Sequence, residues 1–374
     1  MRFPEFKEVW KDSNIGKCFD LYSGNTPSRM EKEHFIGDVN WITSGELKEH
    51  YIGDTKERIS EKAAADNNLR ILPVGTFVMA IYGLEAEGVR GTCSITVKTS
   101  TISQACMAFT PKSNVSNEFL YSWYKKHGNK IGIRYAQGTK QQNLSYDIIE
   151  KFPIRYPSIE EQEKLNTFIS LLDSRIATQN KIIEDLKKLK VAIRDKQLNT
   201  IRKHYGLNYQ ICDLLDYEQP TKYVVTDTEY SEDRSKTPVL TANKAFILGY
   251  TDESFGVYDK GACIILDDFT LDCKYVDFPF KVKSSAIKIL TVKNGCSLRY
   301  VYEYLNYMNL ETTEHKRHYI SEIEPMIIAY PTDKKGIDDF NNIMSSFESK
   351  IEIENKYLQS LLIQKVYLLS NMFI

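Results

Sequence analysis

Two long heptad patterns constrain the fold of this chain more than any other feature of its sequence. The first covers residues 160–201 without a proline or glycine, and the second runs from about residue 337 to the C-terminal end. In both, apolar residues recur at alternating steps of four and three, which is the a/d spacing of a coiled coil. We therefore predict two long helices. Their apolar seam positions are Leu165, Ile169, Leu172, Ile176, Ile183, Leu186, Phe340, Met344, Phe347, Ile351, Leu358 and Leu361.

The second seam is a copy of the first, because each of its positions follows a counterpart in the first at one constant spacing along the chain. The polar interruptions keep that spacing, which separates Gln179 from Glu354 and Lys190 from Lys365; we call it the duplication spacing. Agreement in both phase and polar breaks indicates an internal duplication. A lone helix of about 40 residues would be roughly 60 Å long and would leave its seam exposed. The matched seams favour pairing of the two helices over separate packing of each one.

The rest of the chain divides into two modules with short β-like runs between turn residues, such as residues 75–81 and 262–266. Each module also contains a helical pattern, at residues 115–126 and 298–308. We therefore predict an α+β fold with two mainly β modules and two long helices. The predicted boundaries are 1–157 for the first module, 158–203 for the first long helix, 204–331 for the second module and 332–374 for the second long helix.

Missing motifs argue against catalysis by this chain. The sequence contains no GxxxxGK[ST], no GxGxxG, no GxSxG and no Pro-Pro pair. Its seven cysteines form no CxxC, and His315 with His318 is too small a set for zinc. We interpret the doublet Asp267-Asp268 as a turn after a buried strand rather than as metal ligands. We therefore expect no catalytic residue and no metal site.

Charge and hydropathy limit the cellular compartment and the kinds of partner that we expect for this chain. With 49 basic and 50 acidic residues the net charge is −1, which disfavours a general nucleic-acid coat but allows local basic patches. No apolar run approaches a membrane span and the N-terminal residues lack the apolar core of a signal peptide. We therefore expect a cytoplasmic protein without a membrane partner.

Polar and basic loops in both modules are the candidate binding residues, since amides and cations read base edges and phosphates. The first-module candidates are Arg134, Lys140, Gln141, Gln142 and Asn143. The second-module candidates are Thr241, Asn243, Lys244, Lys283, Ser284, Arg317 and His318. Solvated loops with no function are the alternative interpretation of each segment.

A series of segments in a fixed order resembles a known family. The segments are Ser23-Gly24-Asn25-Thr26-Pro27-Ser28, Asp38-Val39-Asn40-Trp41-Ile42-Thr43-Ser44-Gly45-Glu46-Leu47, Gly138-Thr139-Lys140-Gln141-Gln142-Asn143-Leu144-Ser145, and Pro157-Ser158-Ile159-Glu160-Glu161-Gln162. With the duplicated helices, this order is similar to that of the specificity (S) subunits of type I restriction–modification systems. The second half departs from the pattern, because Gly336-Ile337 stands where the duplication would place a second Glu161-Gln162 pair.

The resemblance implies a non-catalytic DNA-recognition subunit. It implies two target-recognition domains that each read one half of a bipartite, asymmetric site in double-stranded DNA. It also implies that the long helices form an antiparallel coiled coil, which sets the unread spacer and docks the modification subunits, two of them in our expectation. S-adenosylmethionine, ATP and Mg would be bound by those subunits and by a restriction/translocase subunit, with no cofactor on this chain.

Two other classes of protein remain open from the residues alone. One is a coiled-coil scaffold or adaptor with two β-rich ligand-binding modules, which the tandem design and the 24 tyrosines fit equally well. The other is a self-contained nuclease or methyltransferase, which the missing motifs disfavour.

Overall fold

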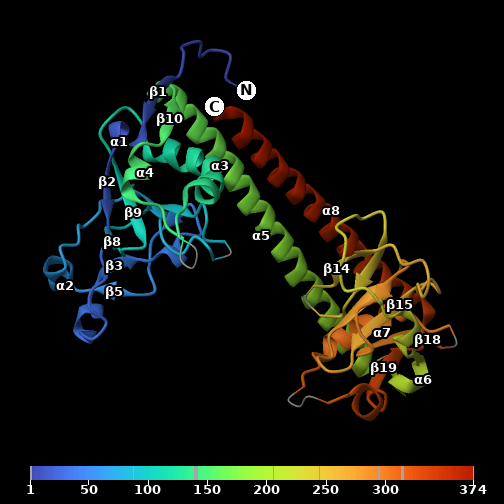
Figure 1. Ribbon diagram of the computed structural model, residues 1–374. Coiled ribbons are helices and arrows are strands. Elements are labelled where there is room, and N and C mark those ends of the chain that lie inside the picture. The colour runs from blue at the N-terminus through green and yellow to red at the C-terminus, as the bar shows by residue number, and fades with distance from the viewer. Residues whose placement is uncertain are drawn as a thin grey trace. The chain divides into compact units, whose positions relative to one another are not determined.

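The computed structural model describes residues 2–86, 88–138, 142–204, 206–243, 245–293, 295–312 and 316–373. The chain separates into two compact units. The first unit comprises Met1–Asn180 and Tyr357–Ile374, and the second comprises Lys181–Lys356. Each unit therefore contains one module together with part of each long helix (Figure 1).

The first module combines short strands with several short helices. Its elements are β1 (Lys11–Asn14), α1 (Ile15–Cys18), β2 (Phe19–Ser23), η1 (Lys32–Phe35), β3 (Val39–Ile42), η2 (Ser44–Glu46), β4 (Tyr51–Ile52), β5 (Arg58–Ile59), α2 (Glu61–Asp66), β6 (Phe77–Ala80), β7 (Cys93–Thr96), β8 (Ser100–Ile102), β9 (Cys106–Pro111), α3 (Asn117–Tyr135), α4 (Tyr146–Glu150) and β10 (Pro153–Tyr156). They form a five-stranded sheet in the order β2-β9-β6-β7-β4, a three-stranded sheet β5-β3-β8 and an antiparallel ribbon β1-β10. Phe77 and Phe109 lie in the core of the larger sheet, because both side chains are fully buried.

The second module repeats this plan with a four-stranded sheet in place of the five-stranded one. Its elements are β11 (Gly206–Gln210), α6 (Ile211–Leu214), β12 (Leu215–Glu218), η3 (Pro220–Tyr223), β13 (Thr237–Leu240), β14 (Ile247–Thr251), β15 (Cys263–Asp267), β16 (Cys273–Val276), β17 (Lys281–Val282), β18 (Ile287–Val292), α7 (Leu298–Met308), η4 (Tyr319–Ile323) and β19 (Ile327–Pro331). The sheets are β12-β18-β15-β16, β14-β13-β17 and the ribbon β11-β19. In both modules the three-stranded sheet contains a parallel pair, β3-β8 and β13-β17.

The two long helices are α5 (Ile159–His204) and α8 (Lys334–Met372). They pair antiparallel within each unit: in the first unit Lys365 Nζ lies 2.5 Å from Asp173 Oδ1, and in the second Lys190 Nζ lies 2.9 Å from Glu348 Oε1. Asp173 and Glu348 are themselves separated by the duplication spacing, as the two lysines are. The duplication inferred from the seams therefore extends to the ion pair between the helices.

The seam positions face the helix pair or the adjoining module. Seven of the twelve are buried, and these are Leu165, Ile169, Leu172, Ile183, Phe340, Met344 and Leu361. The other five are half-buried, and these are Ile176, Leu186, Phe347, Ile351 and Leu358. Burial is deepest where a module covers the helices, because a pair of helices alone leaves one side of its seam open to solvent.

A repeated joint attaches each module to the start of a long helix. Ser116 caps α3 by accepting from the Phe119 amide, and Ser297 caps α7 by accepting from the Tyr300 amide. Each hydroxyl also accepts a hydrogen bond from a long-helix asparagine, Asn166 at 3.3 Å and Asn341 at 2.9 Å. The two asparagines are again separated by the duplication spacing, so the joint is part of the repeat.

The pair Glu161-Gln162 marks where the two joints differ. Both side chains are fully buried. Gln162 accepts from the Ser116 amide and donates to the carbonyls of Asn114 and Pro157. In the second module the Ser297 amide instead donates to the Tyr330 hydroxyl at 2.7 Å. A tyrosine at the end of β19 thus replaces the helix glutamine.

Candidate nucleic-acid interface

The described residues on either side of the amide-rich segment of the first module are held together by backbone hydrogen bonds. The amides and carbonyls of Gln137 and Asn143 hydrogen-bond to each other, and the Leu144 amide donates to the Ile81 carbonyl. Gly138 begins the tip with a φ of +107°, a conformation that glycine adopts without strain. The two ends of this segment, at Gln137 and Asn143, are therefore tied together beside the end of strand β6.

Gln142 is held at one edge of this loop. Its side-chain oxygen accepts from Arg90 at 2.7 Å, and its backbone amide donates to Glu85 at 2.7 Å. Of the other first-module candidates, Arg134 is exposed on the last turn of α3 and stacks on Tyr135 at 5.5 Å. The predicted residues Lys140 and Gln141 lie outside the described residues.

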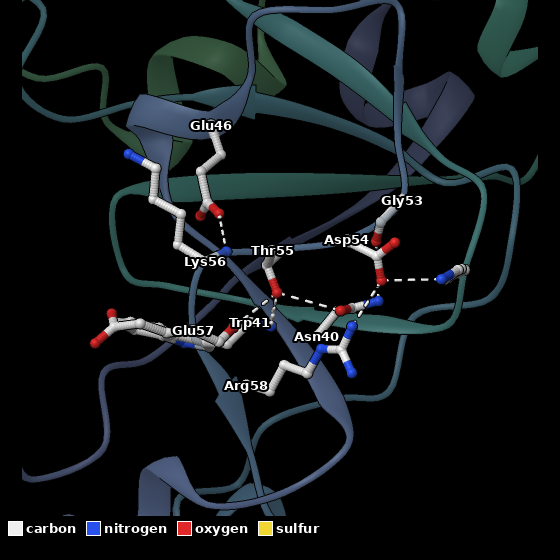
Figure 2. A network of polar contacts seen from close by, with 10 residues as sticks. Asn40, Trp41, Glu46, Gly53, Asp54, Thr55, Lys56, Glu57 and Arg58 are labelled. Atoms are coloured by element: carbon white, nitrogen blue, oxygen red, sulfur yellow. Dashed lines mark hydrogen bonds and ion pairs between the residues drawn. The ribbon is translucent and has the colours of Figure 1, made fainter.

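A second polar surface of the first module lies on the loop between β4 and β5 (Figure 2). Thr55 Oγ1 donates to Asn40 and to the Glu57 carbonyl, and Glu46 accepts from the Lys56 amide at 2.7 Å. These bonds fix the backbone of the loop from its inner side. The charged side chains of the loop lie on its exposed edge.

That exposed edge carries cations which our sequence reasoning missed. Asp54 lies 2.7 Å from Arg58 and 2.9 Å from Lys98, and all three side chains are more than 40% exposed. Arg29 belongs to the same module and is stacked over the rings of Phe35 and Trp41. The dense run of charges at residues 54–58 was the available sequence signal.

Four of the second-module candidates, Thr241, Asn243, Lys283 and Ser284, follow the ends of the parallel strands β13 and β17. The Lys283 amide donates to the Leu240 carbonyl at 3.0 Å, which brings the two following loops together. Lys283 and Asn243 are exposed, and Ser284 is half-buried with its hydroxyl accepting from the Ala286 amide. Lys244 lies outside the described residues.

Thr241 does not share this exposed position. Its side chain is 7% exposed, and its amide donates to the Phe246 carbonyl within the turn. Little of this residue is therefore open to solvent, and its contact with DNA stays a prediction. A threonine in this segment suggested a polar loop, whereas Thr241 directly follows the buried end of strand β13.

His318 is likewise an internal residue rather than a surface one. It is 2% exposed, and its ring nitrogens lie 2.6 Å from Thr312 and 2.8 Å from Glu322. Buried Asp268 accepts from the amides of His318 and Tyr319. These bonds hold the π-helical turn η4, so the histidine shapes the module. Arg317, the preceding residue, is exposed.

The Asp267-Asp268 doublet forms a turn, as we predicted from the sequence. Asp267 Oδ1 accepts from the amides of Phe269 and Thr270, and Leu271 takes a φ of +61°. Among the described residues, no group of three or more His, Cys, Asp or Glu side chains is placed to hold a metal ion. His315 lies outside them.

Two carboxylates of the second module have strongly lowered pKa values. Lys260 at 2.7 Å, with Lys222 and Tyr223, lowers the pKa of Glu218 to about 2. Burial alone would raise the pKa of Glu253, but Lys281 and donors on the neighbouring loop lower it to about 2. Both groups are therefore anions at neutral pH and hold their lysines in place.

The first part of the chain matches a known family of DNA-specificity domains. Residues 7–188 match the family described as type I restriction modification DNA specificity domain. The specificity subunit of the type I restriction enzyme EcoR124I/EcoR124II from Escherichia coli is 48% identical over 125 residues, which are 32% of this chain and 31% of that protein. The MjaIX specificity subunit from Methanocaldococcus jannaschii is 28% identical over 313 residues, 79% of this chain and 70% of that one.

Solved structures agree on the fold. A crystal structure of the type I restriction–modification S subunit from M. genitalium aligns with 100% of this chain and 99% of its own, with a TM-score of 0.61 at 15% identity. A chain from a structure of a type I system, solved to explain complex assembly and conformational transition, aligns with a TM-score of 0.61 at 10% identity and covers 99% and 98% of the two chains. Residues 7–188 thus match this family's domain, and the chain is similar to a type I restriction enzyme specificity subunit over 79% of its length.

In the part of the chain that the structure describes, no helix has both the length and the apolar run needed to cross a membrane.

Proposed function

We propose that each module reads one half of a bipartite, asymmetric site in double-stranded DNA. The observation that carries this proposal is the repeated joint, in which Asn166 and Asn341 attach two equivalent modules to equivalent helix starts. A chain that repeats its framework while changing its exposed loops suits two recognition events on different sequences. Exposed Arg134, Lys283 and Arg317 supply cations, which grip phosphate and read guanine.

The long helices set the unread spacer and dock the modification subunits in this proposal. We propose two such subunits, which bind S-adenosylmethionine and methylate adenine, and a restriction/translocase subunit that uses ATP and Mg. This chain supplies recognition and no catalytic group, and it acts in the cytoplasm. Support comes from the continuous helices α5 and α8, of 46 and 39 residues.

Genome-wide mapping of N6-methyladenine tests the proposal. The chain is co-expressed with its modification subunit, and we expect one bipartite motif with a fixed gap that is absent without the chain. Replacing residues 1–157 with another first module should change one half-site only. A change in both half-sites, or a stable complex without any methylation, would contradict the proposal and favour a scaffold.

The helices offer a separate test of the spacer. Inserting one heptad into both α5 and α8 adds about 10 Å, the rise of about three base pairs. The gap between half-sites should lengthen while their sequences stay the same. An unchanged gap would show that the helices do not set it.

A further inference from the structure

A cavity of about 590 Å³ lies in the second unit, between the end of α5 and the start of α8. Ile193 and Ile201 of α5 form one apolar side, and Phe340 of α8 forms another. The cavity is lined by the two long helices and the connection from β19 to α8, and none of the candidate DNA-reading residues is among its lining residues.

Unsatisfied and charged groups line the same cavity. The side-chain oxygen of Gln197 is buried and has no hydrogen-bond partner, so it lacks a donor. A buried acceptor without a donor is costly and marks a place where a ligand N–H can bind. Asp333 and Asp339 add two carboxylates, of which Asp333 already caps the helix by accepting from the Lys335 and Gly336 amides. A cavity with apolar walls and these groups suits a cation next to an aromatic ring.

The first unit shows how the equivalent helix face is occupied. Arg2 donates to buried Glu161 through two bonds of 2.7 and 2.6 Å. Phe3 packs edge-on against Phe168 at 6.0 Å, and Lys164 lies over the Phe3 ring at 4.7 Å. The segment at the start of the chain thus covers the first three turns of α5 with a basic residue followed by an aromatic one.

The duplication makes one wall of the cavity the counterpart of that covered face. At the duplication spacing, Gly336 corresponds to Glu161 and Asp339 corresponds to Lys164. Gly336 leaves open the volume that the glutamate side chain fills, since an added Cβ would meet only Asp333 at 3.6 Å. Asp339 supplies a carboxylate one turn further along, where the first unit has a cation.

We propose that this cavity binds a short segment of a partner protein in which a basic residue is followed by an aromatic one. The aromatic ring packs between Ile193, Ile201 and Phe340, and the cation pairs with Asp339. A backbone or side-chain N–H of the segment donates to Gln197. Lys196 at the rim favours an acidic residue in the segment after the aromatic one. In the first unit, Glu5 has this position after Phe3 and pairs with Lys164. This inference goes beyond the proposed function and does not depend on it.

Fluorescence anisotropy with a labelled peptide tests the site on the full chain. The probe is the hexapeptide Arg-Phe-Pro-Glu-Phe-Lys, the sequence of residues 2–7, with a scrambled peptide as its reference. We expect saturable binding of the probe, at least tenfold weaker binding by Asp339→Lys, and less than a twofold change for Asp338→Lys. Both aspartates are exposed, and only Asp339 lines the cavity. Absence of saturable binding, or equal losses in the two variants, would overturn the proposal.

A second variant and a second readout separate the other occupants. Thr200→Trp fills the cavity from its exposed rim and should abolish probe binding while circular dichroism stays unchanged. Sedimentation measures self-association: dimers that Asp339→Lys removes would mean that a second copy occupies the cavity, which would overturn assignment to another protein. The peptide assay contains neither DNA nor modification subunit, so its failure would leave the proposed DNA recognition standing.

Discussion

The parallel strand pairs β3-β8 and β13-β17 end with the same backbone hydrogen bond, but the side chains that follow carry opposite charges. The Ser103 amide donates to Ile42 at 2.9 Å, just as the Lys283 amide donates to Leu240 at 3.0 Å. Beyond this shared bond, the first module continues into a turn closed by the carboxylate of Glu46, whereas the second presents Lys283 to solvent. The framework is thus copied between modules, and the groups that it displays are not.

The interiors of the modules differ in the same way. The second module buries charge, with Lys281 beside Glu253 at 2.8 Å and Lys288 beside Asp268 at 3.4 Å. In the first module, the loop after β4 is held by the neutral Asn40 and Thr55 and by the half-buried carboxylate of Glu46 (Figure 2). Buried ion pairs cost desolvation, and loss of one partner is strongly destabilising, so mutations should affect the two modules unequally.

The largest expected contrast lies in the duplicated ion pair between the helices. Lys190 pairs with Glu348 and also with Glu303, which is 1% exposed; burial raises the pKa of Glu303, and Lys190 opposes that shift. Lys190→Met leaves this carboxylate without its cation, and we expect a loss of about 3–5 kcal/mol in the free energy of unfolding. Urea denaturation at pH 7 measures it.

Lys365→Met is the matched control for that experiment. Its pair with Asp173 is about a quarter exposed on both sides, so we expect a loss of about 1 kcal/mol or less. Equal losses in the two variants would show that the duplicated pairs are equivalent, contrary to the difference in their burial.

An acid-dependent loss of stability should come from the first module through α3. Burial, with Lys126 and Lys130 nearby, lowers the pKa of His127 from 6.5 to about 4. The folded state therefore resists protonation: its stability is full above pH 6.5 and falls as the pH drops toward 4, by at most about 1.4 kcal/mol per pH unit. His127→Gln should reduce this loss, measured as the difference in urea midpoints between pH 7 and pH 5.

The second module offers the comparison, because α7 contains no histidine. Opening of each module is followed separately by hydrogen exchange at the two pH values. If hydrogen exchange in α7 increased at the lower pH as much as it does in α3, the assignment of the effect to His127 would be wrong.

The two joints should respond alike. Asn166→Ala removes one hydrogen bond to a capping hydroxyl and Asn341→Ala removes two, and we expect a loss of about 1 kcal/mol in the free energy of unfolding for each variant. Thermal denaturation of both variants measures it, with Asn355→Ala on the exposed side of α8 as a reference. If only one of the two variants lost stability, the asparagine would stabilise one joint and not the other, although the arrangement is repeated in both.

The smallest expected effect lies at the exposed edge of the first module. Asp54 contacts both Arg58 and Lys98, yet Asp54→Asn should leave the free energy of unfolding almost unchanged, since solvent screens all three groups. A urea midpoint clearly below that of the unmodified chain would show that this edge is part of the framework.

The seams, the duplication and a helix in each module could be predicted because they depend on periodicity and chain order. Individual site residues could not. His318 and Thr241 have the side chains of binding loops, but the fold places both inside the module. Asn166 and Asn341 gave no signal of their own, because a polar residue beside a seam usually faces solvent. Their role depends on a serine that is distant along the chain.

The hydroxyls of Ser116 and Ser297 each serve two helices at once. Each one caps the module helix and receives the asparagine of the long helix, so fraying of either helix removes a bond from the other. A module and its adjoining long helix should therefore open in a single cooperative step. Their amides would exchange with one shared free energy, whereas the exposed loops exchange at much lower cost.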